Sequence, residues 1–144
     1  MHTVERYHDI SAGHRVAGHE SKCAHLHGHN YRITFTCVSG HGGLDKLGRV
    51  IDFSIIKEKL CAWLEECWDH KMLLWVDDPN LSKIYAADPE GVVSVPFNPT
   101  AENMAQYLVE VVGPAVLKGT GVDLIKCRVE ETRKCAAFFE LVDY

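Results

Sequence analysis

The stretch HGHNYRITFTCV, residues 27–38, constrains the fold more than any other part of this sequence. From Tyr31 to Cys37, apolar side chains alternate with polar ones, which is the pattern of a β-strand with one buried face. Residues two apart on a strand point to the same face, so the rings of His27 and His29 would lie side by side. On a helix the same spacing would send the two rings to nearly opposite sides. The stretch therefore predicts a sheet that carries paired imidazoles at one strand end.

Other segments have the alternation or the turn signals expected of strands. Residues 123–131 alternate apolar with charged side chains, and the turn GLDKLGR favours a hairpin between residues 29–38 and a short strand that follows. The strands expected from these patterns are residues 3–10, 29–38, about 50–51, 123–131 and about 135–142.

Two segments between the strands have helical periodicity. After Ser54, a suitable N-cap, apolar residues recur at the spacing of a helix with one buried face. A second helix begins near Thr100, with Asn98 or Thr100 as its cap, and Gly113–Pro114 is expected to interrupt it. Between the helices, residues 71–99 contain several turn signals and predict a long irregular excursion. Because helices and strands are segregated along the chain, we expect an α+β fold with an antiparallel sheet.

Length and charge limit the classes of function. At 144 residues the chain suits a single domain, residues 1–144, with a hydrophobic core. The formal net charge is −5 without a basic stripe, so direct binding to nucleic acid is not expected. The charged amino end argues against a secretion signal, and no apolar stretch is long enough to cross a membrane. We therefore expect a cytoplasmic protein whose six cysteines act singly rather than as disulfides.

Histidines are concentrated in one segment, because five of the nine lie between positions 14 and 29. Zinc is well suited to neutral imidazoles, and three protein ligands with one open position form its catalytic arrangement. His27 and His29 supply two ligands, and His14 is the preferred third because a loop can fold the first strand back beside the second. His19 and His25 compete for this place, and His25 is otherwise expected near the metal or the substrate. The spacing lacks the paired ligands of a zinc finger.

Cys23 lies four residues before His27, near the expected dication and several imidazoles. Such neighbours favour the thiolate form of a cysteine. The residues alone leave two roles open for Cys23, a fourth zinc ligand or a free base or nucleophile. The other five cysteines fall on apolar strand phases or helix faces and are expected to fill the core: Cys37, Cys61, Cys67, Cys127 and Cys135.

Three further polar residues stand out. Asp69 precedes His70 at the end of the first helix, and a carboxylate beside an imidazole can fix its tautomer for acid–base work. Glu131 continues the apolar phase of residues 125–129, where an unpaired charge is costly. A flat ligand with adjacent N–H donors would satisfy both of its oxygens. A salt bridge with Arg133 or another arginine, or a strand end open to water, is the reading that the residues alone favour.

These motifs together resemble the 6-pyruvoyltetrahydropterin synthase superfamily. The resemblance rests on Cys23-x3-His27-Gly28-His29-Asn30-Tyr31, preceded by SAGHR and followed by WDH, NPTAEN and VEET, in order along nearly the whole chain. Three residues between the cysteine and HGH are similar to the bacterial branch that forms 6-carboxytetrahydropterin. The animal enzymes that form the pyruvoyl product have a longer gap.

The resemblance implies a T-fold (tunnelling fold), an antiparallel sheet with two helices packed on one face. It also implies a homo-oligomer, a trimer or hexamer assembled through sheet edges, with active sites between subunits. The implied roles are zinc ligands for His14, His27 and His29, the catalytic thiol for Cys23, its acid–base partners for Asp69 and His70, the pterin anchor for Glu131 and a weaker substrate contact for Thr100.

The implied reaction is the zinc-dependent conversion of 7,8-dihydroneopterin triphosphate to 6-carboxy-5,6,7,8-tetrahydropterin, acetaldehyde and triphosphate, on the route to deazapurines such as queuosine. Two alternatives are the pyruvoyl-forming reaction, or a sepiapterin-type side-chain lyase, in the same fold, and a zinc-stabilised pterin-binding protein without turnover. The sequence departs from the family pattern in a shorter gap from His14 to Cys23 and a longer segment at 71–99. The first change bears on the triphosphate entrance, and the second on subunit contacts.

Overall fold

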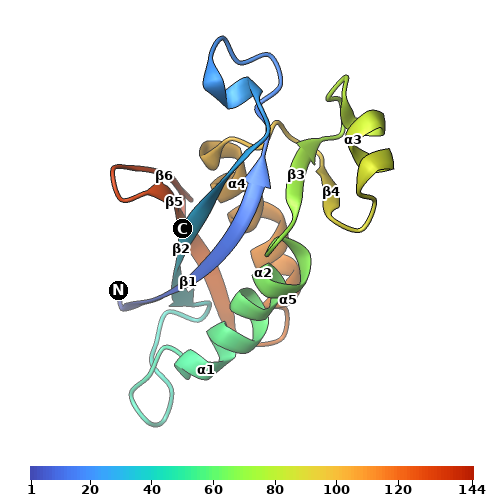
Figure 1. The fold of residues 1–144 in the computed structure, drawn as a ribbon. Helices are drawn as coiled ribbons and strands as arrows, with labels where there is room; N and C mark the ends of the chain where they lie inside the picture. Colours follow the sequence, from blue (N-terminus) through green and yellow to red (C-terminus); the bar gives the residue numbers. More distant parts are fainter.

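The computed structural model describes residues 1–144, built around one six-stranded sheet (Figure 1). The strands are β1 Thr3–His14, β2 His27–Ser39, β3 Met72–Trp75, β4 Val92–Val95, β5 Val122–Thr132 and β6 Cys135–Glu140, in the spatial order β4-β3-β1-β2-β5-β6. The pairs β1–β2, β2–β5 and β5–β6 are antiparallel as expected, whereas β1–β3 and β3–β4 are parallel. The sheet is therefore mixed, while the α+β class is confirmed.

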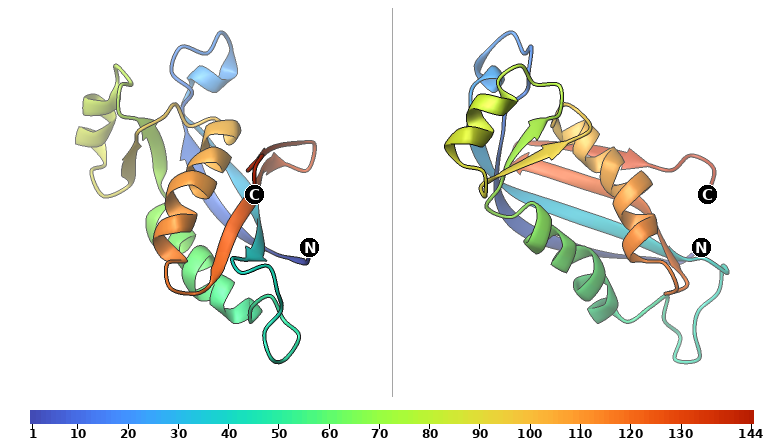
Figure 2. Two further views of the ribbon diagram at one scale, coloured as in Figure 1. Left: turned by 180° about the vertical axis from the view of Figure 1, so that it is seen from behind. Right: turned by 90° about the vertical axis from the view of Figure 1, so that its right-hand side faces the viewer.

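Two long helical segments pack on one face of the sheet, and a short helix lies near the β3–β4 edge (Figure 2). The first long segment runs through α1 Phe53–Ile56, a π turn Lys57–Cys61 and α2 Ala62–Cys67; the short helix is α3 Leu81–Ala87; the second long segment runs through α4 Ala101–Tyr107, a π turn Leu108–Val112 and α5 Gly113–Val116. The two helices that the sequence predicts on one face are thus present.

The irregular excursion predicted for residues 71–99 is wrong, because this segment contains β3, α3 and β4. The two strands read MLLW and VVSV, each only four residues long. Short apolar runs without alternation do not carry the period-two signal of a half-buried strand. Their parallel partners also lie far away along the chain, so the pairing has no local turn signal.

Two other local predictions are also wrong. Residues 50–51 form bends instead of a strand, because the Asp45 carboxylate accepts backbone N–H groups of this loop and folds it on itself. The helix does not break at Gly113–Pro114 but continues to Val116. Proline lacks an N–H and crowds the preceding turn, and the wider π turn at Leu108–Val112 accommodates both effects.

The caps of the two long helical segments are now defined. Asp52, rather than Ser54, is the N-cap of α1, and its side chain accepts a hydrogen bond from the Ser54 N–H. Of the two candidates for α4, Thr100 rather than Asn98 is the cap, since its hydroxyl accepts the Asn103 N–H at 3.1 Å. The carboxylate and the hydroxyl each satisfy one of the free N–H groups in the first helical turn.

Both β1 and β2 extend further than predicted at the end that carries the histidines. Their register pairs His14 with His27 and Gly13 with Gly28. A Cβ atom at Gly28 would lie 3.0 Å from the Ala12 carbonyl oxygen, too close for the backbone to keep its position. A glycine between the two histidines therefore lets the strands pair closely up to the last imidazole.

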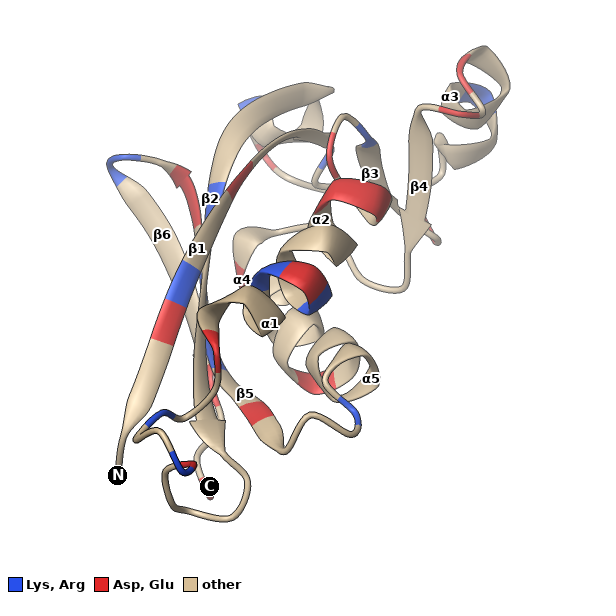
Figure 3. Ribbon diagram, turned by 90° about the horizontal axis from the view of Figure 1, so that it is seen from below, with Lys and Arg blue, Asp and Glu red and all other residues tan.

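The inner face of the sheet and the long helices enclose a cluster of 24 buried apolar residues. His14 is only 2% exposed and lies at the end of this inner face. In the view of Figure 3, basic and acidic residues are interspersed over strands and helices. No helix has the length and apolar character needed to cross a membrane.

We expect Thr100→Ala to lower the free energy of unfolding by about 1 kcal/mol, because the first turn of α4 loses its side-chain acceptor. Urea denaturation followed by circular dichroism measures the change. Ser82→Ala, at an exposed position of α3, is the matched control and should change the value by less than about 0.5 kcal/mol. Equal stability of the two variants would contradict the capping role of Thr100.

Candidate metal centre and active site

Three imidazoles converge where β1 ends and β2 begins. The Nε2 atom of His14 lies 2.9 Å from Nε2 of His27 and 3.2 Å from Nε2 of His29. Ligand atoms of the three residues all lie within 4.8 Å of one another. The structure thus brings together the three histidines preferred from the sequence. The ring of His19 instead accepts a hydrogen bond from the Ser21 N–H of its own loop. The carbonyl oxygen of His25, rather than its ring, contacts the cluster, through a hydrogen bond from the His27 ring.

Hydrogen bonds at Nδ1 define the tautomers of two of these rings. Nδ1–H of His14 donates to the Pro99 carbonyl oxygen at 2.6 Å, and Nδ1–H of His27 donates to the His25 carbonyl oxygen at 2.7 Å. A neutral ring that carries its proton on Nδ1 presents a lone pair at Nε2. Two such lone pairs facing each other at 2.9 Å repel, unless a cation lies between them. The pairing of His14 with His27 therefore fits a metal site.

The spacing and the charge state of the cluster also suit a metal ion. In a tetrahedral site with metal–nitrogen distances of about 2.0–2.1 Å, neighbouring ligand nitrogens are about 3.3 Å apart. The observed separations of 2.9 and 3.2 Å are close to that value. Burial lowers the pKa of His14 and of His29, so both rings stay neutral near pH 7. The three histidines could therefore hold a metal ion.

Glu131 points at the same cluster. Its Oε2 atom lies 3.1 Å from Nε2 of His29 and 3.3 Å from Nε2 of His14. The salt bridge with Arg133 or another arginine, which the residues alone favoured, is therefore wrong. The carboxylate is part of the imidazole site, at the position where β5 ends beside β2.

Cys23 lies in a short 3-10 turn, Lys22–Ala24, within the loop that joins β1 to β2. Its thiol is free and half-buried. Burial raises the pKa of the Tyr31 phenol, and the negative charge of Glu131 raises it further. The Tyr31 ring packs edge-on against His29 with ring centres 5.3 Å apart, and its hydroxyl is buried without a protein partner. The Val16 N–H donates to the Cys23 carbonyl at 2.9 Å, so the loop brings Cys23 back beside the end of β1.

The remaining cysteines divide into core and surface groups. Cys37, Cys61 and Cys127 are buried as predicted, and burial raises the pKa of each thiol. Cys67 is half-buried on α2. The core role predicted for Cys135 is wrong, because β6 is an edge strand and leaves this residue exposed.

Asp69 and His70 form a hydrogen-bonded pair beside β1. Nδ1–H of His70 donates to Asp69 Oδ2 at 2.8 Å, and the Ser11 N–H donates to Asp69 Oδ1 at 2.9 Å. Burial alone would raise the pKa of Asp69, but these hydrogen bonds outweigh it and lower the pKa. His70 has a φ of 59°, a left-handed conformation that is uncommon outside glycine, and its own N–H donates to the Ser11 carbonyl at 2.6 Å. Strand β1 therefore holds both members of the pair.

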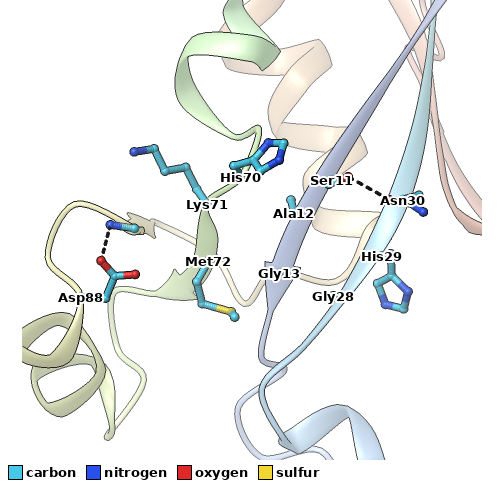
Figure 4. A pocket seen from close by; sticks show the side chains of 11 residues that line it. Ser11, Ala12, Gly13, Gly28, His29, Asn30, His70, Lys71, Met72 and Asp88 are labelled. Atoms are coloured by element: carbon cyan, nitrogen blue, oxygen red, sulfur yellow. Dashed lines mark hydrogen bonds between the residues drawn. The ribbon is translucent and has the colours of Figure 1, made fainter.

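His70 and the imidazole cluster are presented to different sides of the β1–β2 strand pair. His70 lines two hollows of about 490 and 550 Å³ that share Ser11 and Asn30, whose side chains belong to the outer face. His29 also lines the first hollow. The clustered rings continue the inner phase that includes the buried Tyr31. Figure 4 shows His70 beside β1, with the ring of His29 directed away from it. Within one chain, the Asp69–His70 pair and the cluster do not form one site.

A family model described as 6-pyruvoyl tetrahydropterin synthase matches residues 3–141. The chain belongs to the 6-pyruvoyl tetrahydropterin synthase family. All eight site residues predicted from the sequence lie inside the matched region. The resemblance inferred from the Cys23-x3-His27 motif and its neighbours is thereby confirmed.

Curated relatives of this family member align over most of its length. The 6-carboxy-5,6,7,8-tetrahydropterin synthase of Rickettsia felis is 34% identical over 128 residues, which cover 88% of this chain and 91% of the relative. The probable 6-carboxy-5,6,7,8-tetrahydropterin synthase of Halobacterium salinarum is 40% identical over 100 residues, which cover 69% of this chain and 61% of the relative. Membership of the family therefore rests on sequence as well as on fold.

Solved structures show the same fold. An uncharacterized protein from Wolinella succinogenes superposes with a TM-score of 0.83 at 23% identity, over 96% of this chain and 97% of that one. The 6-pyruvoyl tetrahydropterin synthase of Caenorhabditis elegans superposes with a TM-score of 0.68 at 26% identity, over 96% and 94% of the two chains. The T-fold predicted from the sequence is thereby confirmed.

In this family member, the NPTAEN segment supports the site in a way that the sequence did not predict. The Pro99 carbonyl orients His14. The Asn98 side chain both accepts the Ala17 N–H at 3.0 Å and donates to the Ala17 carbonyl at 2.9 Å, which ties the loop after His14 to the start of α4. The Thr100 hydroxyl is engaged as a helix cap, and its contact with substrate stays a prediction. In the sequence, the NPTAEN motif was visible, but the contacts of Pro99 and Asn98 through which it supports the site were not.

Proposed function

We propose that this protein converts 7,8-dihydroneopterin triphosphate to 6-carboxy-5,6,7,8-tetrahydropterin, with release of acetaldehyde and triphosphate. The observation that carries the proposal is the convergence of three imidazole nitrogens beside the loop of Cys23. The name of the Rickettsia felis relative, 6-carboxy-5,6,7,8-tetrahydropterin synthase, supports the choice of reaction. The product would be a cytoplasmic precursor of deazapurines such as queuosine.

His14, His27 and His29 would hold zinc through their Nε2 atoms and leave one coordination position for the substrate. When bound, zinc polarises the side-chain oxygens of the substrate as a Lewis acid, which makes neighbouring protons easier to remove. The carbonyl groups of Pro99 and His25 would keep two of the ligand rings in the required tautomer.

Proton transfer would fall to residues on either side of the substrate. Cys23, as a thiolate, would take a proton from one face of the substrate side chain, and His70, oriented by Asp69, would carry protons on the other. Glu131 would accept the N–H donors of the 2-amino-4-oxo edge of the pterin once its carboxylate turns away from His29. No redox cofactor is needed, because oxidation of the substrate side chain is coupled to reduction of its ring.

The working unit would be a homo-oligomer, a trimer or hexamer. Since His70 shares its hollows with outer-face residues and the imidazole cluster follows the inner phase, one chain alone does not bring Asp69 and His70 to Cys23. We therefore propose that the pair from one subunit acts with the cluster of another. The active site would then form only on assembly.

Incubation of the zinc-loaded protein with 7,8-dihydroneopterin triphosphate tests the reaction, and mass spectrometry identifies the products. We expect 6-carboxytetrahydropterin and acetaldehyde in equal amounts. A pyruvoyl product without acetaldehyde would instead support the pyruvoyl-forming alternative, and cleavage of sepiapterin would support a side-chain lyase. Retention of the pterin without turnover would identify a binding protein.

A further inference from the structure

We propose that the ion pair between Arg15 and Asp78 is a positioning device that holds the Cys23 loop in its working geometry. The long segment after His70 would then serve the candidate active site, because Asp78 lies in the turn between β3 and α3. The inference rests on the proposed function only for the role of Cys23 in turnover. The contacts that carry it are independent of the substrate.

Arg15 connects three parts of the chain through one guanidinium group. Its Nε–H donates to Asp78 Oδ2 at 2.9 Å, and its Nη1–H donates to the Ala24 carbonyl oxygen at 3.0 Å. The Asp78 side chain is 0% exposed and that of Arg15 is 19% exposed, so the pair is shielded from water. A shielded carboxylate requires such a partner, and the planar fork of arginine can serve both acceptors at once. The second acceptor is the residue next to Cys23.

Asp78 is a firm anchor because several hydrogen bonds hold its own turn. Its Oδ1 accepts the Asn80 N–H at 2.8 Å, and its backbone N–H donates to the Trp75 carbonyl at 2.9 Å. The turn follows β3 directly, and β3 pairs with the end of β1 at Gly13 and His14. The carboxylate is therefore fixed relative to the strand that carries the first histidine of the cluster.

The loop that carries Cys23 has few other attachments. Residues 15–26 contain no strand and no helix beyond the short 3-10 turn. Within the loop, the Val16 N–H donates to the Cys23 carbonyl at 2.9 Å. Three side-chain links tie this loop to the rest of the molecule: Arg15 to Asp78, Asn98 to the Ala17 backbone, and His27 to the His25 carbonyl. Arg15 also bonds the Ala24 carbonyl, which lies adjacent to Cys23 in the chain. Loss of this bond would let the thiol shift relative to the imidazole cluster.

Arg15→Lys is the decisive variant. A lysine ammonium can keep the charge pair with Asp78, but as a single point it cannot also reproduce the forked bond to Ala24. We expect kcat to fall by about tenfold to a hundredfold, as a small misplacement of a reacting group does, while KM changes by less than about threefold. Metal content and the thermal midpoint should stay near those of the parent protein. An ion pair that only stabilises the fold would not lower kcat while leaving KM nearly unchanged.

A second readout does not depend on turnover. In a parent with Cys67→Ser and Cys135→Ser, Cys23 is the one cysteine that is not buried, so alkylation by iodoacetamide reports on its loop. We expect Arg15→Lys and Asp78→Asn to speed this alkylation by about threefold or more, because the loop opens locally more often. The matched control is Asp45→Asn, which removes an arginine Nε partner at 2.8 Å in the loop at the far end of the β1–β2 pair.

The outcomes separate this inference from the proposed function. If Arg15→Lys matches the Asp45→Asn control in both alkylation rate and kcat, the positioning role is overturned, even where Asp78→Asn fails to fold. If the parent protein makes no product, the proposed function fails, and faster alkylation in Arg15→Lys still supports the control of the Cys23 loop by Arg15.

Discussion

Replacing Cys23 by alanine should lower kcat by about 10²–10⁴-fold, the range expected when a positioned acid or base is removed. The thiols of Cys37, Cys61 and Cys127 cannot take over its role, since they are buried and burial raises their pKa values. Single-turnover formation of acetaldehyde at saturating substrate measures the loss. The ratio of metal to protein should not change, because three imidazoles remain to hold the ion.

The matched control for Cys23→Ala is Cys135→Ser, which changes an exposed thiol on the edge strand β6. It should retain the parent rate. Two results would count against the catalytic role of Cys23. A parallel loss of metal would show that Cys23 is a ligand, and an unchanged rate would show that the thiol takes no part in turnover.

The parts of the fold that were predictable from sequence are those with a local signal. The alternation from Tyr31 to Cys37 predicted β2, and the register of two long strands then placed His14 opposite His27. Strands β3 and β4 were not predictable in this way, because each is a short apolar run whose partner lies elsewhere in the chain. Long-range parallel pairing leaves no periodicity for a sequence pattern to detect.

The residues of the candidate site also divide into those with a local sequence signal and those without one. The three histidines and the Asp69–His70 pair were predictable, because their spacing and chemistry are local. The contact of Glu131 with two imidazoles was not, because it joins the ends of β5 and β2 across more than a hundred residues. The same is true of the Arg15–Asp78 pair, whose partners lie 63 positions apart. Such contacts depend on the packed fold and have no separate sequence signature.

Removing the metal should abolish turnover and destabilise the protein together. Because metal binds the folded site, free zinc at a hundred times its Kd would add about 2.7 kcal/mol to the free energy of unfolding, and chelation should take this away. His14→Ala should weaken zinc binding by more than about a hundredfold, since loss of even an outer partner costs up to that much. His14 is 2% exposed and its Nε2 atom lies close to those of both other rings. In His14→Ala, a water molecule therefore cannot easily take its place as a metal ligand. Chelator competition measures the affinity.

His19→Ala and His25→Ala are the matched controls for His14→Ala, because both remove a histidine of the same loop that lies outside the cluster. Both should keep the parent zinc affinity, and His25→Ala also keeps the carbonyl that orients His27. Zinc returned to the chelated parent should restore both the rate and the thermal midpoint. Full activity in protein without stoichiometric metal would contradict the metal site, because turnover would then not depend on an ion held by the three imidazoles.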